Sequence, residues 1–221
     1  LIALILHATK NKALAQRELE TQLDFFLNIQ RQAPFSEQLT IPEESGAELL
    51  SHVVTLNKVT ITKDSFGNLV SLSDTASLEM RYYRNNILHT YILHALICRL
   101  LDRHNKINQE ILIANVQSLM VLLKDDLYLY QSSECIAEHT LAILTALQAD
   151  NITKKSKAGF WSLTDDVSLL SQIHTLAECV DESLQRLAII TSLISRLGPI
   201  SKRDLEAKVV AIAKRLSVLN N

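Results

Sequence analysis

Glycine and proline are scarce in this chain, and their scarcity constrains the fold more than any other feature of the sequence. Its 221 residues include only four Gly and three Pro, while leucine, isoleucine and alanine are abundant. Tight turns depend on glycine and proline, whereas aliphatic residues favour helices that pack against one another. Because 48% of the residues are hydrophobic, the chain can bury a substantial core. We therefore expect a mainly α, multi-helix domain.

Hydrophobic residues recur at helical spacing through the N-terminal hundred residues. We expect one helix to end before Pro34, because proline disfavours a helical residue before it. A second helix should begin after Pro42, with acidic residues in its first turn, and run to about Leu56. A third should be capped by Ser73 or Asp74 and continue or kink through to Leu101, and since its second half is apolar nearly all round, it should lie centrally in the core.

Two short segments alternate in the pattern of β-hairpins. In the first, residues 59–62 and 69–72 flank a turn in which Gly67 or Asn68 should adopt a positive φ, since these residue types tolerate it best. In the second, residues 151–154 and 160–163 flank a tip rich in lysine. The sequence thus predicts two small β-hairpins within the helical domain.

The C-terminal part shows helical patterns with clear boundaries. A long helical stretch should start at Thr164 or Asp165 and stop at Gly198, because glycine commonly ends helices and Pro199 follows it. Ser201 should cap a final helix. The apolar stripe of that helix is narrow and favours burial in the core, although flanking basic residues and the basic hairpin tip leave contact with anionic lipid open. The stripe comprises Leu205, Val209, Ile212 and Leu216.

The second half carries the element order of a winged helix, with helices over 108–126 and 132–148 followed by a hairpin. A helix that enters the DNA major groove needs cationic or amide side chains for bases and phosphates. Residues 132–148 contain no Lys or Arg, and the net charge of −2 provides no broad positive field. A winged-helix-like second half is therefore an open alternative for the fold. We expect no nucleic acid as partner.

The domain organisation follows from the absence of linkers and of any repeat of fixed period. We expect residues 1–221 to form one region, with a sub-boundary near residues 102–108 as the alternative. No window approaches the roughly 18 to 20 apolar residues that a spanning helix needs. We therefore expect no transmembrane segment.

The stretch from Arg81 to His89 combines aromatic, arginine and asparagine side chains that core packing alone does not require. Arg81 and Arg84 are one helical turn apart, and paired guanidinium groups can hold a phosphate or a carboxylate. They can equally pair with acidic groups across a domain interface, which is the interpretation we favour. The candidate contact residues for either role are Arg81, Arg84, Asn85, Asn86 and His89.

Two histidine–cysteine pairs raise the question of a metal site. His94 and Cys98 are four residues apart, and Cys135 and His139 repeat that spacing, so that facing pairs could form a tetrahedral zinc site. Cysteine and histidine among aliphatic residues are more often packing residues, and short Cys-x-x-Cys loops are missing. We expect reduced core thiols, no metal site and no cofactor.

Two blocks of sequence resemble the C-terminal region of the bacterial membrane-associated glycerol-3-phosphate acyltransferases. They are SFGNLVSL at residues 65–72 and YYRNN at residues 82–86. The similarity extends from about Leu14 to RLSVL at residues 215–219. The resemblance implies an enzyme that moves an acyl group from acyl-CoA or acyl-acyl carrier protein to the sn-1 hydroxyl of glycerol 3-phosphate in phospholipid synthesis. It also implies a peripheral location on the cytoplasmic side of the bacterial inner membrane, with no cofactor.

In that family, an upstream domain carries a His-x-x-x-x-Asp motif that activates the acceptor hydroxyl. None of the seven histidines here has an aspartate at that spacing. We therefore expect no catalytic residue in this chain, and an upstream acyltransferase domain as its main partner, with peripheral lipid as a further one. The rival hypothesis is a stand-alone helical or winged-helix-like module that binds protein or nucleic acid.

Overall fold

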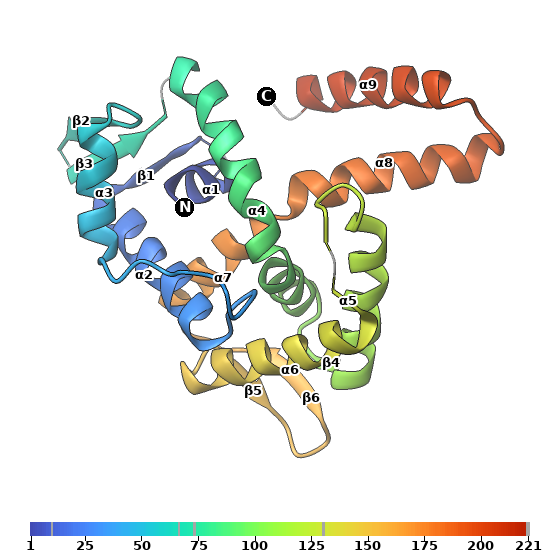
Figure 1. Cartoon of the computed structure of the whole chain (residues 1–221), viewed down its shortest axis with the longest axis horizontal. Coiled ribbons are helices and arrows are strands. Elements are labelled where there is room, and N and C mark those ends of the chain that lie inside the picture. The colour runs from blue at the N-terminus through green and yellow to red at the C-terminus, as the bar shows by residue number, and fades with distance from the viewer. Residues whose placement is uncertain (10, 66, 73, 130, 220–221) are drawn as a thin grey trace. The chain divides into compact units, whose positions relative to one another are not determined.

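The computed structural model of the chain describes residues 1–9, 11–65, 67–72, 74–129 and 131–219. Over these residues the protein is mainly helical with two small antiparallel sheets, as the sequence predicted (Figure 1). It forms two compact units, Leu1–Val180 and Asp181–Asn221. The polar turn at 102–108 lies within the first unit, and the sub-boundary expected there stays a prediction.

The first unit opens with a motif of six elements, called here the first motif (residues 2–71). Its sheet has the order β1-β3-β2, with Leu14 and Ile61 both opposite the fully buried Val70 of the central strand. The turn between β2 and β3 places Gly67 at φ +135°, which confirms the expected positive φ. The elements are α1 (Ile2–Ala8), β1 (Ala13–Ala15), α2 (Gln16–Gln32), α3 (Gly46–Thr55), β2 (Thr60–Asp64) and β3 (Gly67–Ser71).

The next six elements repeat this order and form the second motif (residues 74–163). Its sheet has the order β4-β6-β5, so that the last strand again lies between the other two, with Trp161 opposite both Ile107 and Lys155. The β5–β6 hairpin projects below α6 in Figure 1. The elements are α4 (Asp74–Arg103), β4 (Ile107–Asn108), α5 (Gln109–Leu123), α6 (Ser133–Ala149), β5 (Thr153–Lys155) and β6 (Phe160–Leu163).

Both motifs therefore show a winged-helix order, which the sequence predicted only for the second. In each, a very short strand leads directly into a helix, and the helix pair is followed by the hairpin. Strands β1 and β4 were not predicted, because two or three residues are too short to show alternation. The chain thus contains a structural repeat without a repeated sequence pattern.

Two helix boundaries differ from those expected. Helix α3 begins at Gly46 rather than directly after Pro42, because Ser45 and Glu48 form a capping box in which each side chain accepts from the other's backbone N–H. The long C-terminal stretch is two helices, α7 (Val167–Glu178) and α8 (Asp181–Leu197). Asp166, instead of Thr164 or Asp165, caps α7 by accepting from the N–H groups of residues 168 and 169.

The core of the first unit is built around α4. Residues 91–98 are buried in succession, which confirms that this apolar part of the helix is central. Helix α4 packs on α1, α5, α6 and α7. Two hydrogen bonds tie it to α2: the Gln30 side chain donates to the Thr90 carbonyl at 2.7 Å, and the Tyr91 hydroxyl donates to the Phe26 carbonyl at 3.1 Å.

The second unit is a helical hairpin of α8 and α9 (Lys202–Leu219). Gly198 ends α8 at φ +68°, and its N–H donates to the Ile194 carbonyl, as expected for a glycine cap. Ser201 caps α9 by accepting from the Asp204 N–H at 3.1 Å. The predicted core stripe of α9 is only partly covered, since Leu216 is 43% exposed and the other three residues are half-buried.

Candidate functional site

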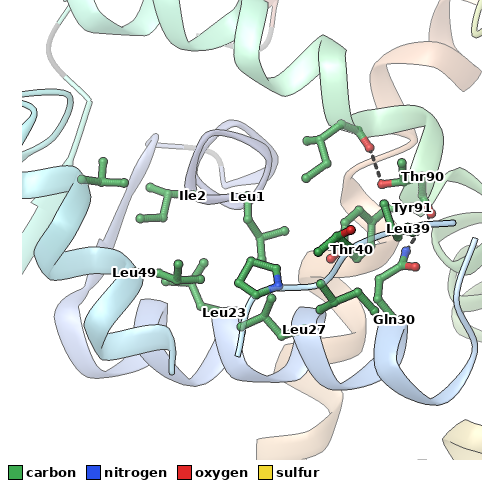
Figure 2. A pocket seen from close by; sticks show the side chains of 14 residues that line it. Leu1, Ile2, Leu23, Leu27, Gln30, Leu39, Thr40, Leu49, Thr90 and Tyr91 are labelled. Atoms are coloured by element: carbon green, nitrogen blue, oxygen red, sulfur yellow. Dashed lines mark hydrogen bonds between the residues drawn. The ribbon is translucent and has the colours of Figure 1, made fainter. Parts of the chain in front are cut away.

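An apolar pocket of about 240 Å³ opens on the first motif, between its helices α2 and α3, its connection over residues 33–45, and α4 of the second motif (Figure 2). Figure 2 shows Leu23, Leu27 and Gln30 of α2 on one side of it, with Leu49 of α3 and Thr90 of α4 around them. The amphipathic pattern of α2 puts Leu23 and Leu27 on this side. Further aliphatic wall residues are Ile2, Leu39, Ile41, Val53 and Ile87.

The polar side chains in the pocket wall already have partners inside the protein. Gln30 donates to the Thr90 carbonyl, and its Oε1 accepts from the Phe35 N–H at 3.0 Å. The Thr90 hydroxyl donates to the Ile87 carbonyl at 2.8 Å. Burial raises the pKa of Tyr91, whose hydroxyl is engaged with α2. Thr40 is exposed, as expected for a residue at the solvent side. The wall therefore offers a hydrophobic surface with its buried side-chain hydrogen bonds complete.

The predicted contact residues lie along the first half of α4 and do not line this pocket. Arg81, Asn85 and Asn86 are exposed, while Arg84 is half-buried and donates to the Asn85 side chain at 2.9 Å. The half-buried His89 packs its ring edge-to-face on Phe35, with centroids 5.4 Å apart. The structure thus keeps the five residues on one helix, and none of them lines this apolar pocket.

The structure adds two basic residues to the arginine cluster that sequence analysis missed. Burial is the main cause that lowers the pKa of His7 to about 4, and the positive charges of Arg84, Lys12 and Arg81 lower it further. The Lys12 ammonium donates to the Ser77 hydroxyl of α4 at 3.0 Å. Four basic side chains therefore gather where α1 ends beside α4. No local pattern could indicate this, because His7 and Arg81 are joined only through tertiary packing.

The two histidine–cysteine pairs do not form a metal centre in the part of the chain that the structure describes, where no group of three or more His, Cys, Asp or Glu side chains is placed to hold an ion. His94 is buried, and its Nε2 hydrogen-bonds the Ala33 carbonyl at 2.9 Å. Burial lowers the pKa of His94 to about 4 and raises that of the Cys98 thiol to about 12. Cys135 contacts His139 of its own helix at 3.9 Å.

Comparison with known proteins identifies the family. The model of the "Glycerol-3-phosphate acyltransferase C-terminal region" matches residues 1–221. The chain belongs to this family. A glycerol-3-phosphate acyltransferase of Colwellia psychrerythraea is 75% identical over 221 residues, which cover 100% of this chain and 27% of that protein. One of Aeromonas hydrophila is 33% identical, again over 100% of this chain and 27% of its own length. These matches confirm the resemblance and favour it over the stand-alone module.

This acyltransferase C-terminal region thus spans about a quarter of the length of the curated relatives it matches. Within the described residues, no helix combines the length and the apolar character that crossing a membrane requires.

Proposed function

We propose that the chain is the non-catalytic C-terminal part of a glycerol-3-phosphate O-acyltransferase, which transfers an acyl group from acyl-CoA or acyl-acyl carrier protein to the sn-1 hydroxyl. The observation that carries this proposal is the family match over all 221 residues, together with relatives of about four times the length. The lack of a His-x-x-x-x-Asp sequence supports the non-catalytic role, because no such pair is present to activate the acceptor hydroxyl.

The test compares the purified 221-residue chain with the full-length protein, using glycerol 3-phosphate and palmitoyl-CoA. Full-length protein should form lysophosphatidic acid, whereas the chain alone should form none while its circular dichroism shows helix. Acylation by the isolated chain would overturn the non-catalytic assignment. No acylation by the full-length protein would overturn the enzyme assignment itself.

The proposed role of this region is to dock on and close the upstream acyltransferase domain through the first half of α4. Leu78 is 74% exposed, and Tyr82 and Tyr83 are 67% and 46% exposed. Exposed tyrosine and leucine next to Arg81 resemble the composition of a protein interface. Since most of the relatives' length lies outside this chain, we commit to the upstream domain as the occupant of this surface.

Arg84→Ala in the full-length enzyme should lower the melting temperature and the activity together, because its interface partners lose a charged hydrogen-bond donor. Arg103→Ala, at the exposed C-terminal end of the same helix, is the matched control and should change neither. If activity falls steeply while the melting temperature of Arg84→Ala stays that of wild type, the arginine acts in substrate binding and the docking proposal is wrong.

A peripheral location on the cytoplasmic side of the inner membrane is also part of the proposal. Lys202, Lys208 and Arg215 are exposed beside the incompletely covered stripe of α9, an arrangement suited to an anionic lipid surface. At the tip of the second hairpin, Lys154 pairs with Asp165 at 3.1 Å and Lys155 lies over the Trp161 ring, so these charges are already engaged. Flotation of full-length protein with phosphatidylglycerol vesicles should fall when Lys202, Lys208 and Arg215 are replaced together by glutamine.

A further inference from the structure

We propose that the apolar pocket of the first motif binds the hydrocarbon tail of the acyl donor, and that Val53 and Leu49 of α3 limit the chain length it accepts. This inference rests on the proposed function, since it assigns part of the substrate to a site in this region. The tail would enter past the exposed Thr40 and lie between α2 and α3. The catalytic step itself would occur outside this chain.

The chemistry of the wall selects a hydrocarbon over a polar occupant. Among the described residues that line the pocket there is no Asp, Glu, Lys or Arg. Gln30, Thr90 and Tyr91 each already donate a side-chain hydrogen bond within the protein. A peptide segment would bring amide groups that these side chains could not satisfy, and an unsatisfied buried amide is strongly unfavourable. An alkyl chain needs no hydrogen-bond partner.

The size of the pocket also fits several methylene groups. An engineered cavity of about 150 Å³ lined by aliphatic and aromatic residues is large enough to bind benzene, and this pocket has about 240 Å³. Each methylene removed from water strengthens binding about fourfold. A pocket of this kind can therefore discriminate strongly between tails that fill it and tails that stop short or exceed it.

The pocket is held open by contacts at both ends of the 33–45 connection. Near its start, the Phe35 N–H donates to Gln30. Near its end, the Arg31 guanidinium donates to the Pro42 carbonyl at 2.6 Å, which fixes that connection to α2. Val53 is half-buried in the opposite wall, so that a larger side chain there can occupy the open volume without displacing core packing. The adjacent Val54 is also half-buried but does not line the pocket.

The test uses full-length enzyme and compares kcat/KM for octanoyl-, lauroyl- and stearoyl-CoA. Val53→Phe should reduce kcat/KM for stearoyl-CoA by about tenfold or more relative to octanoyl-CoA, since excluding two methylenes at about fourfold each changes the ratio by that amount. Val54→Phe, the same change one residue further along α3, should keep the wild-type ratio. An unchanged ratio in Val53→Phe would overturn the proposal. Failure of wild-type enzyme to acylate with any donor would instead overturn the proposed function.

A second measurement does not depend on how the variants fold. Wild-type full-length enzyme is irradiated with an acyl-CoA that carries a diazirine near the end of its tail, and the labelled peptides are mapped. Labels should fall on α2 and α3, and excess unmodified stearoyl-CoA should suppress them. Labels found only outside α2 and α3 would show that the tail lies elsewhere and would overturn the proposal.

Discussion

The first and second motifs share an element order and a strand order but differ in how their helix pairs are joined. In the first, the connection over residues 33–45 passes between α2 and α3 and borders the apolar pocket. In the second, residues 124–132 join α5 and α6, and the Gln117 side chain donates directly to the Ser133 carbonyl at 2.8 Å. A hydrogen bond also joins α2 and α3, from the Gly46 N–H to Asp24 at 2.6 Å, so the first motif differs in its longer connection and in the apolar pocket that this connection borders.

The two motifs also differ in their first helix. Helix α1 has five consecutive buried residues, Ile2 to Leu6, and is enclosed by other helices. Helix α4 is much longer and presents an exposed half, which carries Arg81, and a buried half, which forms the core of the first unit. Neither third helix, α3 nor α6, contains Lys or Arg, so neither has the side chains that a major-groove helix uses. We propose that the fold here serves packing and docking.

The largest expected effect tests whether the two motifs unfold together. Leu96 of α4 is fully buried, and Leu96→Ala should lower the free energy of unfolding by about 2 to 5 kcal/mol, because truncation leaves a cavity. Urea denaturation of the 221-residue chain measures this loss. Because α4 packs on elements of both motifs, amide exchange should accelerate in β3 and in β6 alike. The comparison for Leu96→Ala is Leu112→Ala, which truncates a fully buried side chain of α5. If exchange accelerates in only one motif in Leu96→Ala, the motifs are independent folding units.

The next effect is a pH dependence to which the buried His94 contributes alongside His7. The folded pKa of His94, about 4, lies below the ordinary 6.5, so folding favours the neutral ring. This contribution to stability is complete above about pH 6.5 and is lost as the pH falls toward 4, by about 1.4 kcal/mol per pH unit within that window.

His94→Gln tests that window, because glutamine can keep a donor to the Ala33 carbonyl without titrating. The free energy of unfolding of this variant should fall less steeply with decreasing pH than that of wild type. His104→Gln, just beyond the end of α4 and exposed, should follow wild type. An identical slope in all three proteins would mean that His94 is protonated in the folded state or neutral in both states.

Local patterns predicted the features that local chemistry determines. Gly67 and Gly198 take positive φ where the turn and the cap require it, and Ser201 caps α9 by accepting from the Asp204 N–H. The buried half of α4 followed from an apolar run with no polar face. The pocket did not follow, because its wall joins residues from α1, α2, α3 and α4 that are distant in sequence. The basic cluster was found only in part, because His7 and Lys12 reach Arg81 through tertiary packing.

The repeat of the motif was missed for a related reason. Two segments can adopt the same order of helices and strands when their apolar positions have compatible spacings. Unrelated residues can fill these positions. The buried centre of the first sheet is Val70, whereas Trp161 occupies the central strand of the second. A search for sequence periodicity detects repeated residues, whereas this chain repeats only the order of its helices and strands.

The smallest effect compares one glycine from each motif. Gly46 begins α3 against α2, where a Cβ would lie 2.9 Å from the Leu23 Cβ and would also clash with the Glu20 carbonyl oxygen. Its N–H donates to Asp24 at 2.6 Å, which fixes this approach. Gly46→Ala should therefore lower the free energy of unfolding by about 1 to 3 kcal/mol through overpacking. Gly159→Ala has open space around it and should cost only about 1 to 2 kcal/mol, through its φ of +78°.

The two glycine variants should differ more clearly in their preference between acyl-CoA substrates than in their free energy of unfolding. Pushing α3 away from α2 moves Leu49 and Val53, which form one wall of the pocket, whereas Gly159 lies in the hairpin of the other motif. In full-length enzyme, Gly46→Ala should change the ratio of kcat/KM for octanoyl- and stearoyl-CoA, and Gly159→Ala should leave it unchanged. Equal ratios in both variants, with the expected stability losses present, would show that the α2–α3 spacing does not control the tail. The difference between the motifs would then be one of packing alone.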